Sequence, residues 1–186
     1  MHMSIADLVI AVPPPKCPAY SGTPAAWDVI EQILEIQLPQ DYKKLINSYG
    51  TGCFLNFLSP LSPFAPFSTN LNLLSGDTKQ LLSSYASGRK EFPEYSPPFE
   101  GYPLPGGLFP WATTINGDVL FWLMRGHCDL WPTVVCDSKF SEDYDLLEMN
   151  VTTFLCLWFG GQVSPRSFPQ GLRGANPAFL PLSKTK

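Results

Sequence analysis

Residues 108–136 read LFPWATTINGDVLFWLMRGHCDLWPTVVC, which is three apolar runs separated by two polar turns. The first turn contains Asn116-Gly117. Asn-Gly between apolar runs is the strongest short hairpin signal, because both central residues of a type I′ turn take a positive φ. We therefore predict antiparallel strands, joined as a meander, over residues 108–113, 118–124 and 130–136.

Two helices are predicted before this meander. Thr23-Pro24 supplies an N-cap followed by a proline at the first helical position, and this helix should end before Pro39. A second helix begins at Pro39 and ends at Gly50. The apolar residues at helical spacing are Trp27, Ile30, Ile33 and Leu34 in the first helix, and Tyr42, Leu45, Ile46 and Tyr49 in the second.

The remaining elements have weaker patterns. We predict a first strand over 53–58, a third helix over 72–87, a proline-rich surface loop over 92–110, a fourth strand containing 144–147, and a last helix over 151–159 capped by Asn150. The fold class is therefore α+β, with an antiparallel meander packed against N-terminal and C-terminal helices. We divide the chain into a proline-rich arm (1–23), one domain (24–161) and an irregular tail (162–186) that packs on the domain or trails from it.

The composition favours a cytoplasmic protein without a membrane span or disulfide framework. No apolar run approaches the ~20 residues that a membrane helix needs. The five cysteines are odd in number, scattered and without C-x-x-C spacing, so we expect reduced thiols and no zinc site. Three tryptophans of the meander could be stacking platforms or core residues: Trp111, Trp122 and Trp131.

Charge is distributed unevenly along the chain. Residues 1–160 contain all 16 Asp and Glu but only eight of the 12 Lys and Arg, so this part is acidic. An acidic domain disfavours direct nucleic-acid binding, which needs basic groups to neutralise phosphates, and it favours a basic protein partner. The sequence leaves the oligomeric state open.

The densest acidic segment is the candidate partner-binding face. Within 17 residues that contain a single base, Lys139, it holds Asp129, Asp137, Glu142, Asp143 and Asp145. A Ca²⁺ site is an alternative, but the segment lacks the glycine and the terminal glutamate of an EF-hand loop. A merely solvated acidic surface is the other alternative.

No catalytic or cofactor site is predicted. His2 is interpreted as part of a vector remnant, which leaves His127 as the one candidate base, next to Cys128. A Cys-His pair could act in nucleophilic catalysis, although neighbours in sequence often point apart, and a plain turn is the alternative. Nucleophile-elbow, phosphate-loop, dinucleotide and H-E-x-x-H motifs are all absent, so we expect no enzyme activity, cofactor or metal.

Three segments resemble the SMI1/KNR4 (SUKH) superfamily. Residues 27–52 contain W-x-x-I-E and then LPQDYKKLINSYGTG, which is similar to the family's opening motif. Residues 109–136 resemble its central W-G-x-T-x-x-G-D-x-L-x-W meander, with Ala112 where the family usually has glycine, and 149–160 resemble its T-x-x-F-L helix. Residues 59–107 and the tail show no match of this kind.

The resemblance implies a non-enzymatic protein-binding domain. Bacterial members of the superfamily mostly serve as immunity proteins, so the resemblance implies neutralisation of a cognate polymorphic or contact-dependent toxin, with a basic toxin domain such as a nuclease as partner. A regulatory scaffold of the cell-wall-signalling type is the alternative that the fungal relatives suggest. An uncharacterised hydrolase is a third.

Overall fold

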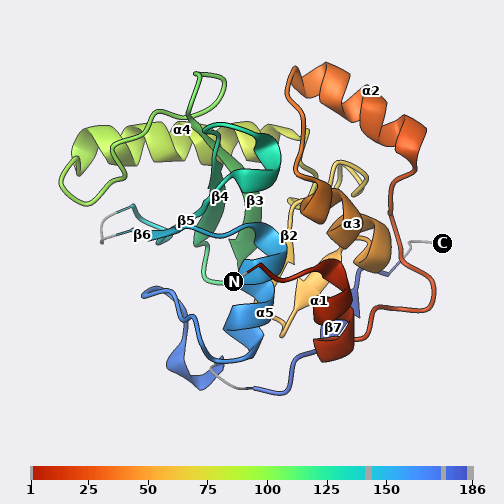
Figure 1. The fold of residues 1–186 in the computed structure, drawn as a ribbon. Coiled ribbons are helices and arrows are strands. Elements are labelled where there is room, and N and C mark those ends of the chain that lie inside the picture. Colours follow the sequence, from red (N-terminus) through yellow and green to blue (C-terminus); the bar gives the residue numbers. More distant parts are fainter. Residues whose placement is uncertain (1, 141–143, 173–174, 184–186) are drawn as a thin grey trace.

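The computed structural model describes residues 2–140, 144–172 and 175–183 (Figure 1). Its helices are α1 (Ile5–Ala11), α2 (Pro24–Leu34), α3 (Gln40–Tyr49), α4 (Gly76–Glu91) and α5 (Val151–Phe159), with short 3-10 turns η1 (Cys128–Leu130) and η2 (Gln170–Leu172). Its strands are β1 (Gly52–Phe54), β2 (Leu58–Pro60), β3 (Leu108–Thr114), β4 (Val119–Leu123), β5 (Thr133–Cys136), β6 (Asp145–Leu147) and β7 (Phe179–Pro181). None of the helices in these ranges is long and apolar enough to cross a membrane.

The strands form one antiparallel sheet in the order β6-β5-β4-β3-β2-β1-β7. The predicted meander is at its centre, because β3, β4 and β5 are neighbours along both the chain and the sheet. The α+β fold class and the antiparallel meander are therefore confirmed. The segment expected to be one strand over 53–58 is instead a hairpin of β1 and β2, paired at Phe54 and Leu58.

The turn between β3 and β4 differs from the predicted type I′ turn. Asn116 keeps a negative φ, and only Gly117 takes a positive value, +89°. The Gly117 N–H donates to the Thr114 carbonyl and the Thr114 N–H donates to the Asp118 carbonyl, both at 3.0 Å. This is the three-residue hairpin loop with a bulge at a glycine. The Thr114 hydroxyl also bonds the Asp118 carboxylate at 2.8 Å, and this buried side-chain pair favours the wider turn.

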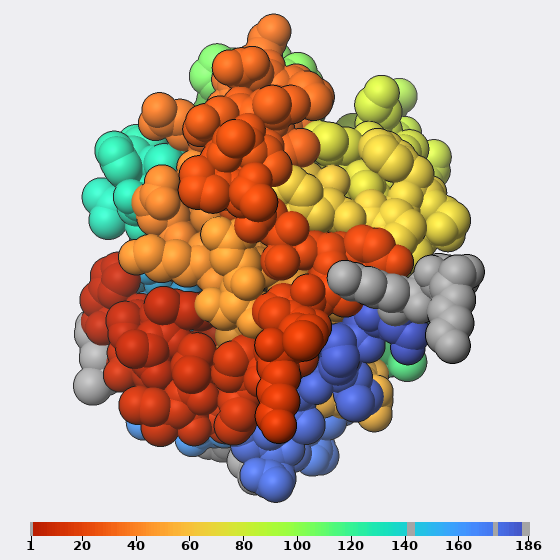
Figure 2. All heavy atoms as spheres, turned by 90° about the vertical axis from the view of Figure 1, so that its right-hand side faces the viewer, coloured from red at the N-terminus to blue at the C-terminus, as the bar shows by residue number. Residues whose placement is uncertain are grey.

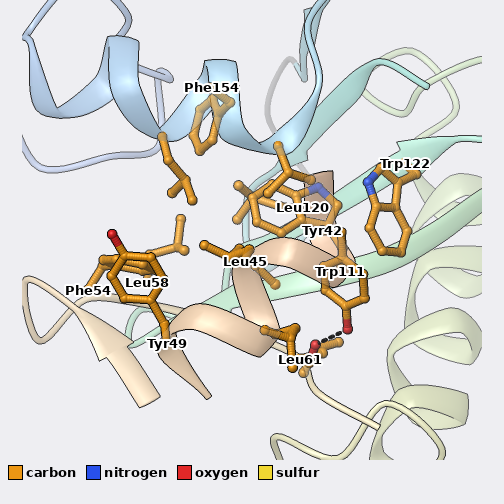
Figure 3. Packing of buried hydrophobic residues seen from close by; sticks show 14 of the residues in the cluster. Tyr42, Leu45, Tyr49, Phe54, Leu58, Leu61, Trp111, Leu120, Trp122 and Phe154 are labelled. Atoms are coloured by element: carbon orange, nitrogen blue, oxygen red, sulfur yellow. Dashed lines mark hydrogen bonds between the residues drawn. The ribbon is translucent and has the colours of Figure 1, made fainter. Parts of the chain in front are cut away.

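Helices cover both faces of the sheet, so β4 is buried along its whole length. Leu120 and Trp122 belong to the main core with α3 and α5, and Figure 3 shows the core side chains around Phe154 and Leu45. The alternate residues of β4, Val119, Phe121 and Leu123, face a smaller cluster on the other side, where Tyr85 of α4 packs on Phe121 with ring centroids 5.3 Å apart. Strand residues alternate between faces, which explains how five consecutive apolar residues of β4 are all buried.

The meander tryptophans are core residues. Trp111 and Trp122 are fully buried and Trp131 is 6% exposed. The Trp111 ring lies 6.0 Å from Phe154 of α5 in an edge-on contact. The stacking-platform interpretation is therefore wrong, because these rings are not accessible to a ligand.

Two elements lie in the segments expected to be an arm and an irregular tail. Helix α1 begins with a capping box between Ser4 and Asp7, and it buries Leu8 completely. Strand β7 pairs with β1, and its Phe179 ring lies 4.8 Å from Phe54. Both elements depend on contacts that are distant in sequence, which local patterns do not report.

Helix α4 begins later than the predicted range of 72–87. Asn72 is fully buried, and its side chain accepts the Leu74 N–H at 2.8 Å and donates to the Ala65 carbonyl. These bonds hold the loop before the helix in a non-helical conformation. Ser75 then caps the helix by accepting the Asp77 N–H.

Asp41 links two helices that pack on the same face of the sheet. One carboxylate oxygen accepts the Tyr42 N–H at 2.8 Å in α3, and the other accepts the Thr152 N–H at 2.9 Å in the first turn of α5. Burial raises the pKa of Asp41, the two N–H donors act in the opposite direction, and the nearby charge of Asp129 raises it slightly. The carboxylate thus satisfies a backbone donor that α5 cannot satisfy itself.

Replacing Asp41 should destabilise the fold. We expect Asp41→Ala to lower the free energy of unfolding by about 1–3 kcal/mol, because it leaves two backbone donors without their partner. Urea unfolding followed by circular dichroism measures this. Asp28→Ala, at an exposed position of α2, is the control and should change stability by no more than about 0.5 kcal/mol. An equal effect of the two substitutions would contradict the linking role of Asp41.

The parent protein and the Asp41→Ala variant should also differ in how their stability depends on pH. Because the pKa of folded Asp41 is raised above the ordinary value of 3.8, the folded state binds this proton more tightly than the unfolded state does. The stabilising contribution of that proton is complete below the ordinary pKa and is lost as the pH rises through the raised one. We therefore expect the stability difference between the parent and Asp41→Ala to be larger at acid pH than at neutral pH. A difference that shrinks on acidification would contradict the raised pKa.

Candidate partner-binding surface

The residues that carry the family resemblance build the core. Tyr42 donates its hydroxyl to the Leu61 carbonyl (Figure 3), and its ring meets the edge of Trp122 at a centroid distance of 4.8 Å. Trp27 donates its indole N–H to the Asn47 side chain at 2.9 Å and packs edge-on against Phe64 at 4.8 Å. These side chains are used inside the fold and are not available for binding another protein.

Asp129, Asp137 and Asp145 lie at turns and strand ends, as expected, but each is already hydrogen-bonded. Asp129 in η1 accepts the Gln40 N–H at 2.6 Å at the start of α3. Asp137, just after β5, accepts the Lys139 N–H at 3.0 Å. Asp145 of β6 accepts the Arg166 N–H at 2.8 Å and forms an ion pair with the Arg166 guanidinium at 3.4 Å. The structure therefore leaves these carboxylates only part of their hydrogen-bonding capacity for a partner.

The two remaining predicted residues, Glu142 and Asp143, lie outside the described residues. Asp145 is opposite Val135 in the β5–β6 pair, and Asp137 follows two residues after Val135. Both carboxylates are close enough to the buried Cys136 thiol to add to the rise in its pKa that burial causes first. Asp137 and Asp145 thus share one end of the sheet edge.

Asp129 does not join them. It precedes β5 whereas Asp137 follows it, so the two carboxylates lie at opposite ends of that strand. Asp129 instead lines a hollow of about 240 Å³ with Asp41, Lys44 and Asn150. Three of these side chains accept N–H groups at helix starts: Asp129 from Gln40, Asp41 from Thr152, and Asn150 from Thr153. This hollow is a junction of helix caps.

His127, Cys128 and Asp129 have donor atoms within 4.8 Å of one another. His127 Nδ1 accepts the Asp129 N–H at 3.3 Å and caps η1. Burial, and then the charge of Asp129, raises the pKa of the Cys128 thiol. A catalytic cysteine needs the opposite shift, because the thiolate is the nucleophile. The donor set could contact a divalent ion, but His127 and Asp129 already accept backbone hydrogen bonds, which favours a structural turn.

A second surface was not recognised in the sequence. Val29 and Ile33 of α2 are 53% and 60% exposed, although Ile33 had been grouped with the apolar residues at helical spacing. The buried residues of this helix are Trp27, Ile30 and Leu34. Val29 and Ile33 are four residues apart and therefore form a separate stripe. The helix already has one apolar face that packs on the core, so a second apolar pair at i, i+4 is the sequence signal that could have identified this surface.

Comparison with protein families identifies a match over most of the chain. A family model of the SUKH type, described as SMI1-KNR4 cell-wall, matches residues 25–155, from the second residue of α2 to the middle of α5. No curated protein and no solved structure matches the chain significantly.

The thiol chemistry of the His127–Asp129 turn is testable. We expect Cys128 to react slowly with iodoacetamide at pH 7, because its raised pKa keeps it protonated, and to react faster as the pH is raised. Exposed Cys17 should be alkylated first. Mass spectrometry of the labelled peptides distinguishes the two sites, with Cys128→Ser as the control. Rapid labelling of Cys128 at pH 7 would instead indicate an activated thiol.

Proposed function

The chain belongs to the SMI1-KNR4 family, and from this membership we propose that it is a non-enzymatic protein-binding domain that neutralises a cognate toxin domain. The family match carries the proposal, because it spans most of the helices and strands that form the main core. The proposal places the protein in the cytoplasm, where a delivered toxin would act. All five cysteines lie in the described ranges as free thiols, which is typical of a reducing compartment.

The titratable groups support binding over catalysis. Burial raises the pKa of four of the five thiols, and that of Cys156 reaches about 11. His127, the candidate base, caps a 3-10 turn through Nδ1. A nucleophilic mechanism would need a thiolate beside an available base. In the described residues, the thiol next to His127 is that of Cys128, and its raised pKa disfavours the thiolate.

The acidic domain supports a basic partner. Nuclease toxins bind phosphate backbones and so tend to be basic, and an acidic inhibitor gains association rate and specificity from opposite charge. Asp137 and Asp145 share one end of the sheet edge, and Glu142 and Asp143 lie between them in the sequence. We propose this acidic edge as one contact with the toxin. Asp129 is at the other end of β5, and we propose only an indirect role for it through the start of α3.

The function is tested by protection. When a toxin domain encoded by a neighbouring gene is expressed, co-expression of this protein should rescue growth, and His127→Ala/Cys128→Ala should rescue as well as the parent if its urea midpoint is unchanged. Binding of the purified toxin domain is measured in parallel by calorimetry. Absence of both binding and rescue by the parent would refute the immunity proposal. A stable double variant that binds but does not protect would favour an enzyme.

The role of the acidic edge in association can be tested separately. We expect Asp137→Asn/Glu142→Gln/Asp143→Asn to slow association with a basic toxin domain and to flatten its salt dependence, because charges at the rim of an interface act mainly on the association rate. Stopped-flow fluorescence at low and high salt measures both effects. Glu94→Gln, at an exposed loop position, is the matched control. If the triple variant associates like the control at both salt concentrations, the acidic edge is solvated surface and the contact lies elsewhere.

A further inference from the structure

Helix α2 lies at the rim of the molecule, and one side of it faces no other element. Figures 1 and 2 show it at the top of two perpendicular views with nothing above it. Its inner side is fixed by Trp27, whose ring lies 5.8 Å from Tyr42. Its outer side exposes Val29 and Ile33. The helix is thus firmly seated on the core while it presents aliphatic side chains to solvent.

The fold does not explain these two exposed residues. Valine and isoleucine are weaker helix formers than alanine, lysine or glutamate, because β-branching restricts their side chains against the preceding turn. At an exposed helical position neither burial nor propensity favours them. Isolated exposed apolar residues are common, but a pair at i, i+4 forms one continuous stripe. Such a stripe indicates contact with another surface.

A nearby loop adds apolar surface at the C-terminal end of the helix. The Tyr102 hydroxyl donates to the Leu34 carbonyl at 2.8 Å, which ties the loop to the last residue of α2. Two residues further on, Leu104 is 51% exposed. An exposed leucine thus lies two residues from the point at which this loop is tied to the end of α2.

Carboxylates line the side of α2 next to the stripe, and α2 itself contains no Lys, Arg or His. Residues 17–42 contain four acidic residues and no Lys, Arg or His. A hollow of about 450 Å³ beside the helix is lined by Asp28, Glu31, Gln32, Glu35, Ile36 and Gln37. Glu31 pairs with Lys43 and accepts the Leu38 N–H at 2.7 Å. Asp28 and Glu35 are exposed and, within the described ranges, form no ion pair.

We propose that the outer face of α2, made by Val29 and Ile33 with Asp28 and Glu35, is a docking surface for a basic protein segment that places an apolar side chain between lysines or arginines. The inference rests on the proposed function, because it assigns a second contact to the same toxin partner. Opposite charge selects the occupant: the carboxylates would repel nucleic acid and anionic lipid, whereas a basic segment pairs with them and its apolar side chain covers the stripe.

The α2 face is separate from the acidic edge. In Figure 1, α2 and β6 lie on opposite sides of the molecule. The acidic edge offers charge and acts on the association rate, whereas the α2 face offers desolvated apolar contact, which acts mainly on dissociation. The two surfaces therefore have distinct kinetic consequences.

A synthetic peptide tests the chemistry of the α2 face directly. The probe is an amphipathic helical peptide of leucine and lysine, titrated into the isotope-labelled full chain while amide chemical shifts are followed. We expect the shifts to centre on α2 and the affinity to fall about tenfold in Val29→Gln/Ile33→Gln. Asp28→Asn/Glu35→Gln should weaken binding and reduce its salt dependence. A peptide with glutamate in place of lysine should not bind.

The matched control is Ile10→Gln/Ile115→Gln, which removes two other exposed aliphatic residues, 82% and 76% exposed, and should bind the probe like the parent. Because glutamine could weaken the helix, Val29→Ala/Ile33→Ala provides a second variant with high helix propensity. Equal loss in the α2 and control variants, or shifts spread over the whole surface, would overturn the proposal. So would a parent dimer that the α2 variant converts to monomer, since the face would then bind a second copy.

The toxin domain separates this inference from the proposed function. If it binds the parent and dissociates about tenfold faster from Val29→Gln/Ile33→Gln, the α2 face is supported. If it binds parent and variant equally, the α2 inference fails while the immunity proposal stands. If it does not bind the parent, the immunity proposal fails.

Discussion

The structure depends on the first turn of α3, where two adjacent side chains join three parts of the fold. Tyr42 packs its ring on Trp122 of the sheet and bonds the Leu61 carbonyl after β2. Asp41, next to it, satisfies the Thr152 N–H at the start of α5. The sheet, the N-terminal helices and the C-terminal helix are thereby held in one arrangement. A buried carboxylate is tolerated here because two backbone N–H groups compensate part of its desolvation.

That arrangement determines where recognition can occur. The aromatic residues that match the family's opening motif are buried, and its acidic residues, Glu31 and Asp41, accept backbone N–H groups within the fold. Family likeness therefore identifies the scaffold and leaves the partner open. The proposed binding would use residues that the core does not need for its own packing. The outer side of α2 and the end of the β5–β6 edge meet this condition, because each surface belongs to an element whose other residues pack in the core. Relatives could therefore change partners at these sites without changing the core.

Local patterns predicted the meander because each of its strands is an apolar run with a turn signal beside it. They did not predict α1 or β7, whose stability comes from distant contacts such as Phe179 on Phe54. The Asn-Gly turn was located correctly but assigned the wrong type, because the Thr114–Asp118 bond is not a property of the dipeptide. The acidic segment was predicted as one face, yet β5 runs through it and separates Asp129 from Asp137. Proximity in sequence does not give proximity in space across a strand.

Charge counted along a sequence is not the charge that a partner meets. Glu31 and Glu35 are four residues apart, yet Glu31 is held by Lys43 and the Leu38 N–H, while Glu35 is exposed. Asp145 is similarly shared with Arg166. A partner that recognised only the net charge would gain little binding free energy, because exposed ion pairs contribute weakly and salt screens them. In the proposed docking on α2, specificity would come from carboxylates close to apolar surface, so that pairing a lysine or arginine also desolvates an aliphatic contact. Asp28 and Val29 are both exposed on this helix.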